Sequence, residues 1–287
     1  MLGSGAVGTV HLCLNQETNL LQAMKVISRS SLKTWGGTAT RTLQFNEMEV
    51  LKSLDHRNIV KLHEIIDDPL KNKIYMIMDY LPGGTLADKL SRCESGLPER
   101  EVWQYFRDLI SALHYCHEVK SLSHRDVKPE NMMLSEEGNL VLCDFGVSQF
   151  FTSKRALITG MMGTMRFMAP ECFKPDSRKK LSGKKLDIWA AGVTLYLLLT
   201  SKYPFGGDTQ QEIERQTLTN DPPLAAIQNE DARCLLGQML QKDPETRIEV
   251  SLIIKDKWVS SAGADPLELN SSMHQSSISS ELINHFI

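Results

Sequence analysis

A short polar stretch in the middle of the chain, HRDVKPEN from His124 to Asn131, constrains the fold more than any other feature of the sequence. It gathers Asp126, Lys128 and Asn131 in one loop, and Asp144 follows after two short strand-like segments. Charged and amide side chains brought together in this way cost free energy unless a ligand compensates them. The fold must therefore place these residues at a binding site.

The hydrophobic pattern divides the chain into two parts. The first eighty residues predict a small sheet with one helix, and the remainder predicts a mostly helical unit. Strands are expected at 9–15, 20–28, 59–66 and 73–81, and helices at 43–54, 97–119, 186–199, 231–240 and 250–258. The apolar run from Leu186 to Thr200 is shorter than the ~20 residues that a membrane span requires and contains Asp187, so we expect a buried core helix.

Composition excludes several classes of partner and location. The formal net charge of −3 gives no global reason to expect nucleic acid or an anionic membrane as a partner. None of the six cysteines forms a Cys-x-x-Cys pair, and the chain shows no secretory signal. We therefore expect a reducing, cytoplasmic location.

The chain opens with MLGSGAVGTV, in which Gly3, Gly5 and Gly8 form a G-x-G-x-x-G pattern. In dinucleotide-binding folds the third glycine begins a helix, whereas strand-like residues follow it here. A hairpin lid over phosphate groups therefore fits better. Such a lid requires a cation nearby; Lys25 on the next strand could supply it, and Glu47 on the following helix could hold the ammonium group. A lone lysine on a strand is more often a solvated edge residue. The glycines, Lys25 and Glu47 are therefore a more specific signal together than any one of them is alone.

With DFG at Asp144–Gly146 and APE at Ala169–Glu171, these motifs resemble the complete, ordered signature of the protein kinase family. The resemblance covers residues 1–258. It implies an α+β, bilobal protein kinase fold, with a small antiparallel sheet and one helix in the first lobe and a larger helical second lobe. We expect the lobes at 1–81 and 82–259, followed by a flexible serine-rich tail at 260–287. Family members begin several residues earlier, so we expect a shortened N-terminus and a less anchored lid.

The resemblance also assigns roles in transferring a phosphoryl group from ATP with Mg²⁺. Asp126 would accept the proton of the substrate hydroxyl, Lys128 would contact the γ-phosphate, and Asn131 and Asp144 would hold Mg²⁺. Lys25 would bind the inner phosphates with Glu47 as its brace. Asp187 would brace the catalytic loop, and Glu171 would pair with Arg247. The remaining ATP contacts are expected from Gly3, Ser4, Gly5, Gly8, Val10, Ala23, Met78, Asp79, Leu81 and Met133.

Lys128 and Thr164 follow the serine/threonine pattern, and several segments resemble the calcium/calmodulin-dependent protein kinase kinases, with the liver-kinase-B type a close second. The resemblance implies a protein substrate, the activation loop of another, AMP-activated-type kinase. Because residues 260–287 contain no Lys or Arg, we expect no calmodulin binding.

Two residues carry further hypotheses. Thr159 could be a regulatory phosphorylation site, although loops are commonly rich in hydroxyls, and Cys143 could react with an electrophile bound in the ATP site, although a small buried thiol is often inert. Two alternatives remain open: a pseudokinase that keeps the fold as a scaffold, and a kinase of small molecules, which the segment GTMRFMAPE disfavours.

Overall fold

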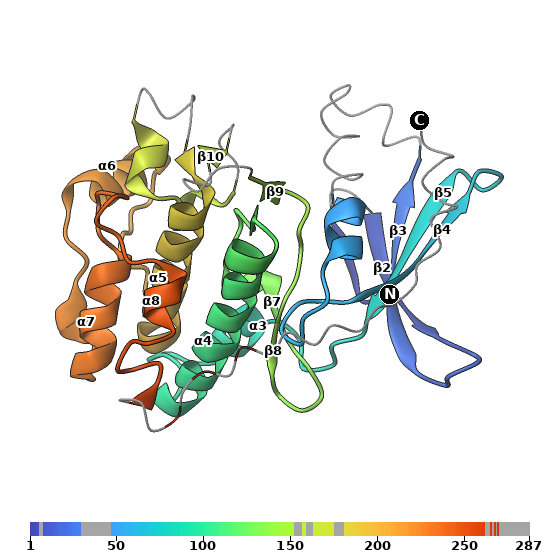
Figure 1. Ribbon diagram of the computed structural model, residues 1–287, viewed down its shortest axis with the longest axis horizontal. Helices are drawn as coiled ribbons and strands as arrows, with labels where there is room; N and C mark the ends of the chain where they lie inside the picture. The colour runs from blue at the N-terminus through green and yellow to red at the C-terminus, as the bar shows by residue number, and fades with distance from the viewer. Residues whose placement is uncertain are drawn as a thin grey trace.

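A computed structural model of the chain describes residues 1–5, 8–29, 47–151, 157–158, 163–174, 181–261, 265, 267 and 269, with the backbone alone at residues 4 and 5. Two lobes are visible in Figure 1, one built from strands and the other mainly from helices. This is the α+β, two-lobed arrangement expected from the sequence.

The smaller lobe is a five-stranded antiparallel sheet with the order β1-β2-β3-β5-β4. Its register places Val10 opposite Lys25, and Ala23 opposite Met78, so one face of the sheet collects residues expected at the ATP site. A helical segment at 47–53 packs with it. The strands are β1 (Gly3–Gly5), β2 (Gly8–Leu14), β3 (Leu21–Ser28), β4 (Leu62–Asp68) and β5 (Lys73–Asp79).

The larger lobe is mainly helical, and α4 (Glu99–His114) and α5 (Gly183–Thr200) pack against each other within it (Figure 1). Its helices are α3 (Leu86–Leu90), α4 (Glu99–His114), the π-helical turn η1 (Tyr115–Val119), α5 (Gly183–Thr200), α6 (Gln210–Thr219), α7 (Glu230–Met239) and α8 (Val250–Ile253). Short hairpins and turns connect them: β6 (Leu122–Ser123) with β9 (Gln149–Phe150), β7 (Met132–Leu134) with β8 (Leu140–Leu142), β10 (Leu157–Ile158) with β11 (Leu181–Ser182), and the 3₁₀ turns η2 (Pro129–Asn131), η3 (Met165–Phe167), η4 (Pro170–Phe173) and η6 (Leu224–Ala226).

Helix α6 is absent from the sequence-based expectation. It is largely polar and buries only Ile213 and Thr217, so hydrophobic periodicity does not mark it. Its local signal is the capping box of Thr209 and Glu212, in which each side chain bonds to the other's backbone N–H. Helix α8 is also shorter than expected and ends at Ile253.

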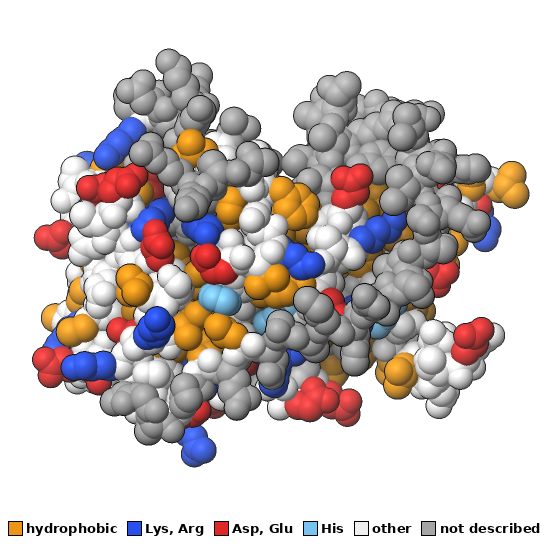
Figure 2. All heavy atoms as spheres, viewed as in Figure 1, with side chains coloured by type: hydrophobic (Ala, Val, Ile, Leu, Met, Phe, Trp, Pro, Cys, Tyr) orange, Lys and Arg blue, Asp and Glu red, His pale blue; other side chains and the backbone are white. Residues whose placement is uncertain are grey.

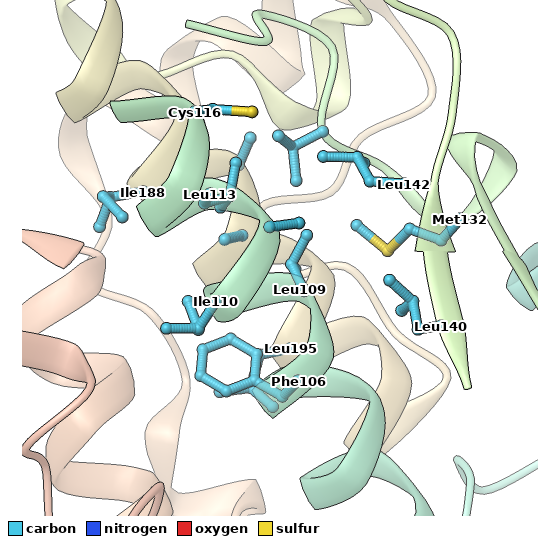
Figure 3. Close-up of a cluster of buried hydrophobic side chains, with 14 of the residues drawn as sticks. Phe106, Leu109, Ile110, Leu113, Cys116, Met132, Leu140, Leu142, Ile188 and Leu195 are labelled. Carbon is cyan, nitrogen blue, oxygen red and sulfur yellow. The ribbon is translucent and has the colours of Figure 1, made fainter. Parts of the chain in front are cut away.

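The hydrophobic core lies between α4, α5 and the β7–β8 hairpin (Figure 3). One stripe of α4, including Phe106, Leu109 and Leu113, is fully buried. Helix α5 is buried on nearly all sides, which confirms that the apolar run at 186–200 is a core helix. Within the described parts of the chain, no helix is both long and apolar enough to cross a bilayer.

Candidate active site

A buried carboxylate on α5 fixes the backbone of the loop after β6. Asp187 is 1% exposed; its Oδ2 accepts the His124 N–H at 2.8 Å, and its Oδ1 accepts the Arg125 N–H at 2.7 Å. His117 places Nε2 2.8 Å from the same Oδ2. These bonds satisfy a charge that would otherwise be costly to bury, and they anchor the loop to the rigid core helix.

The anchored loop holds an unusual backbone conformation at Arg125, whose φ of 72° lies in the left-handed region. Such a conformation is disfavoured for a residue with a long side chain and persists only where the surroundings impose it. The bond from the Arg125 N–H to Asp187 supplies that constraint. His124 adds a second one, because its ring packs edge-on against Phe145 at 4.7 Å between centroids.

The carboxylate of Asp126 is the centre of a hydrogen-bond network in this loop. Its Oδ1 accepts the N–H of Thr164 at 3.1 Å and the hydroxyl of the same residue at 3.0 Å. Its Oδ2 lies 3.0 Å from Asn131 Nδ2 and 2.7 Å from Lys128 Nζ. Lys128 also bonds to the Thr164 hydroxyl at 2.6 Å. Asp126, Lys128 and Asn131 are therefore brought together as the sequence predicts, with Thr164 of the segment GTMRFMAPE.

Burial alone would raise the pKa of Asp126, but the hydrogen bond and charge of Lys128, with bonds from Thr164 and Asn131, hold that pKa below its ordinary value. The group is thus an ionised acceptor at neutral pH. Both its oxygens already have partners, so an incoming hydroxyl must replace one of these contacts.

In the smaller lobe, β3 presents Lys25 to the helical segment at 47–53. Lys25 Nζ lies 2.6 Å and 2.8 Å from the two carboxylate oxygens of Glu47, which is 5% exposed. The predicted ion pair is therefore present. A methyl group built at Gly146 would lie 3.9 Å from Glu47 Oε2 and 3.2 Å from Asp144 Oδ1, so the ion pair faces the Asp144–Gly146 turn.

Asp144 has a positive φ of 59°, and its Oδ1 accepts the N–H of Gly146 at 3.2 Å. Phe145 is fully buried. The carbonyl of Asn131 accepts the Cys143 N–H at 2.8 Å, which joins the two segments that carry the predicted metal ligands, Asn131 and Asp144. Mg²⁺ is commonly held by one or two side chains together with substrate phosphates, and an amide oxygen beside a carboxylate suits it.

A cleft of about 720 Å³ separates the lobes, a volume that falls in the usual range of ligand pockets. Its lining contains Lys25, Glu47, Asn131 and Asp144. The six residues predicted to surround the base all line it as well: Val10, Ala23, Met78, Asp79, Leu81 and Met133. The N–H of Asp79 already donates to Lys61 O at 3.1 Å, so Asp79 has only its backbone carbonyl to offer a base.

The opening glycines differ in what a side chain at each position would contact. Gly3 and Gly5 lie in β1, Gly3 lines the cleft, and nothing lies within 4 Å of a methyl group built at Gly3. At Gly8 the same methyl group would be 2.1 Å from the carbonyl oxygen of Val26 on β3. Gly8 is therefore required by the close approach of two strands, a reason that the motif does not reveal. The Ser4 side chain lies outside the described residues.

Two further sequence expectations concern supporting residues. Arg247 forms a two-pronged ion pair with Glu171, with Nη–Oε distances of 2.7 Å and 2.9 Å, as the resemblance implied. Burial raises the pKa of the Cys143 thiol, which disfavours the thiolate that reacts with electrophiles. Thr159 and residues 270–287 lie outside the described residues.

Sequence reasoning missed two supporting residues. His117 shares the buried carboxylate of Asp187, and Gln149 accepts a hydrogen bond from Arg125 Nη1 at 2.9 Å. Neither carries a local signal, because each contact joins segments far apart in the sequence. Among the described residues on the face shown in Figure 2, positive and negative side chains are interspersed and form no continuous basic surface.

Comparison with known proteins agrees with this geometry. The family model of the protein kinase domain matches residues 1–259. Serine/threonine-protein kinase ppk34 of Schizosaccharomyces pombe is 33% identical over 306 residues, which cover 94% of this chain and 84% of the yeast protein.

Two longer relatives are similar at the same level. The calcium/calmodulin-dependent protein kinase kinase of Caenorhabditis elegans is 33% identical over 288 residues, covering 93% of this chain and 52% of the relative. CBL-interacting protein kinase 25 of Oryza sativa is 34% identical over 264 residues, covering 90% of this chain and 50% of the relative. The chain thus spans about half the length of these two proteins. It belongs to the protein kinase family and is of the serine/threonine type.

Proposed function

We propose that this chain transfers the γ-phosphate of Mg²⁺-bound ATP to serine and threonine hydroxyls of proteins, and that it acts upstream of another kinase. The observation that carries the proposal is that one cleft is lined by the Lys25–Glu47 pair and by Asn131 and Asp144, beside the Asp126 network. Phosphoryl transfer depends mainly on positioning and on neutralising charge, and this arrangement supplies both.

Each side chain then has a physical task. Lys25, held by Glu47, binds the inner phosphates, and the backbone of Gly3, Ser4, Gly5 and Gly8 covers them. Asn131 and Asp144 hold Mg²⁺, which neutralises charge on the phosphates when it is bound. The hydrophobic walls of the cleft, including Val10, Ala23 and Met133, enclose the base.

Asp126 orients the substrate hydroxyl. In the described structure Thr164 occupies the position from which a hydroxyl donates to Asp126 Oδ1, at 3.0 Å. A substrate hydroxyl that takes such a bond is aligned with its oxygen free to attack. Lys128 lies 2.7 Å from Asp126 Oδ2 and can move its charge to the transferred phosphoryl group. The low pKa of Asp126 favours orientation first and proton acceptance late in the reaction.

The transfer is tested with labelled ATP and purified acceptor proteins. We expect incorporation into serine and threonine that requires Mg²⁺ and is lost in Asp144→Asn. Transfer that survives this substitution would contradict the metal role. A chain that binds ATP without any transfer would instead be a pseudokinase scaffold.

The upstream role is supported by resemblance to the Caenorhabditis elegans relative, whose name describes a kinase of kinases. The acceptor to test is a catalytically inactive AMP-activated-type kinase, compared with a variant whose activation-loop threonine is replaced by alanine. Equal labelling of the two acceptors would refute this role.

Regulation and organisation are also part of the proposal. We expect no calcium-dependent capture of this chain by calmodulin, because residues 260–287 lack basic side chains. The lobes comprise 1–81 and 82–259, and a cytoplasmic location fits six free cysteines. Thr159 remains the candidate regulatory phosphorylation site; unchanged activity of Thr159→Ala would exclude that role.

A further inference from the structure

Among the residues that the structure describes, Arg166 has no carboxylate partner, and it lies on the segment that adjoins the catalytic loop. It lies in η3, and its Nη2 donates to the carbonyl of Gly207 at 3.2 Å. Its guanidinium carbon lies 4.8 Å from the centroid of the Tyr203 ring. Within the described ranges it forms no other polar contact, whereas Arg247 is fully paired with Glu171.

The position of Arg166 relative to the reacting groups follows from the chain itself. Thr164 contacts both Asp126 and Lys128, and Arg166 is two residues further on. The Cα atoms of Thr164 and Arg166 are therefore within about 7 Å of each other. Phe167 is buried and anchors the turn, while Arg166 stays half-buried. A protein that presents a hydroxyl to Asp126 therefore passes close to the backbone of Arg166.

Tyr203 is also close to the catalytic loop, because it lines one small pocket together with Pro129 and Glu130. Burial raises the pKa of the Tyr203 hydroxyl; the negative charge of Glu130 raises it further, and the positive charge of Arg166 opposes this. Glu130 precedes Asn131 in η2 and is exposed. Tyr203 is therefore within reach of two opposite charges, those of Arg166 and Glu130.

One nearby acidic group, Glu212, is committed to other partners. Glu212 accepts the N–H groups of Asp208 and Thr209 as the cap of α6, and the charge that acts on it is that of Arg215. The stacked guanidinium of Arg166 thus keeps N–H donors that a carboxylate or phosphate can accept in a planar, two-bond geometry.

We propose that Arg166 is a specificity-determining residue that binds an anionic side chain of the protein substrate, a carboxylate or a phosphate, close to the hydroxyl that is phosphorylated. This inference rests on the transfer reaction proposed above. The alternative is a purely structural clamp between η3 and the loop before α6.

The test uses peptides with one threonine in a neutral background, with a single glutamate moved through each position on either side. We expect glutamate at the position facing Arg166 to raise kcat/KM about fivefold, the effect of a partly exposed charge pair, chiefly through KM. Phosphoserine at that position should have a larger effect. Arg166→Gln should remove the gain, Arg166→Lys should keep part of it, and Arg166→Glu should favour lysine there instead.

The matched control is Arg100→Gln, which removes the same charge from an exposed position at the start of α4. It should leave both the glutamate gain and the wild-type kcat for the neutral peptide unchanged. A gain that survives in Arg166→Gln, no gain at any position in the wild type, or an equal loss on every peptide would overturn the proposal.

Fluorescence anisotropy with the same peptides separates the two proposals. Without any transfer, a glutamate-dependent affinity that disappears in Arg166→Gln would support the anion site while contradicting the kinase mechanism. Affinities that do not depend on charge would reject the anion site.

Discussion

Replacing Asp187 by asparagine tests whether one buried carboxylate sets the geometry of the catalytic loop. The two carboxylate oxygens accept the backbone N–H groups of His124 and Arg125, at 2.8 Å and 2.7 Å. An amide has only one acceptor oxygen, so in either orientation its NH₂ group faces one of these donors. The variant therefore loses one charge-assisted bond, and its NH₂ group faces a buried backbone N–H group that has no acceptor.

The expected cost follows from these contacts. One hydrogen bond to a charged group contributes about 2 kcal/mol, and an unsatisfied buried donor costs about 1–3 kcal/mol more. Removing a buried charge offsets part of this, so we expect a loss of about 3 kcal/mol in the free energy of unfolding. The midpoint of thermal unfolding should fall by roughly 6–10 °C.

Activity should fall beyond what stability explains. Arg125 keeps its positive φ through Asp187, and a shift of about 1 Å in the adjacent Asp126 can cost about 100-fold in rate. We expect kcat to fall at least about tenfold at a temperature where the variant is fully folded, measured by peptide phosphorylation.

Asp108→Asn is the matched control. Asp108 is also buried and accepts the N–H of Leu140 at 2.9 Å, but it does not touch the catalytic loop. It should lose stability and keep kcat. Wild-type stability and rate in Asp187→Asn, or an equal loss of kcat in Asp108→Asn, would refute this explanation.

Three further predictions concern the lid, the core and the cleft. Gly8→Ala should lower thermal stability and weaken ATP binding, because the added methyl group would lie 2.1 Å from the Val26 carbonyl oxygen. Gly3→Ala should change stability little, because nothing lies within 4 Å of its added methyl group. Similar stability losses in the two variants would contradict this. Burial lowers the pKa of His56 to about 4, so the unfolded chain binds a proton that the folded chain excludes. Urea titrations should therefore show stability falling by about 3 kcal/mol as pH drops from 6.5 towards 4, with a flatter slope in His56→Gln; an equal slope would count against it. Iodoacetamide should alkylate Cys143 more slowly at neutral pH than the exposed Cys234, and ATP should slow it further; rapid, ATP-insensitive labelling would exclude the placement of Cys143 in the cleft.

The sequence predicts the fold and the membership of the site because both depend on residue type and order. Apolar runs mark β3 and β5, and the order of the glycine, HRD and DFG motifs is specific to one fold. Helix α6 escapes this reasoning because it buries few apolar residues, and a capping box is a weak signal by itself.

The sequence does not predict the three-dimensional contacts that tune the site. Nothing local indicates that Gly8 is needed by Val26, or that His117 shares the carboxylate of Asp187. The pKa of Asp126 likewise depends on Lys128, Thr164 and burial together. Such properties depend on distances between segments that only the folded chain brings together.

In the proposed mechanism, Asp126 orients a protein hydroxyl towards ATP bound in the cleft. The most direct measurement is the rate of phosphoryl transfer by Asp126→Asn to a threonine peptide, with the dissociation constant of Mg²⁺-bound ATP determined on the same sample. We predict a fall in kcat of about 10²–10⁴-fold with nucleotide affinity within about twofold of wild type. Transfer at the wild-type rate in this variant would contradict the claim.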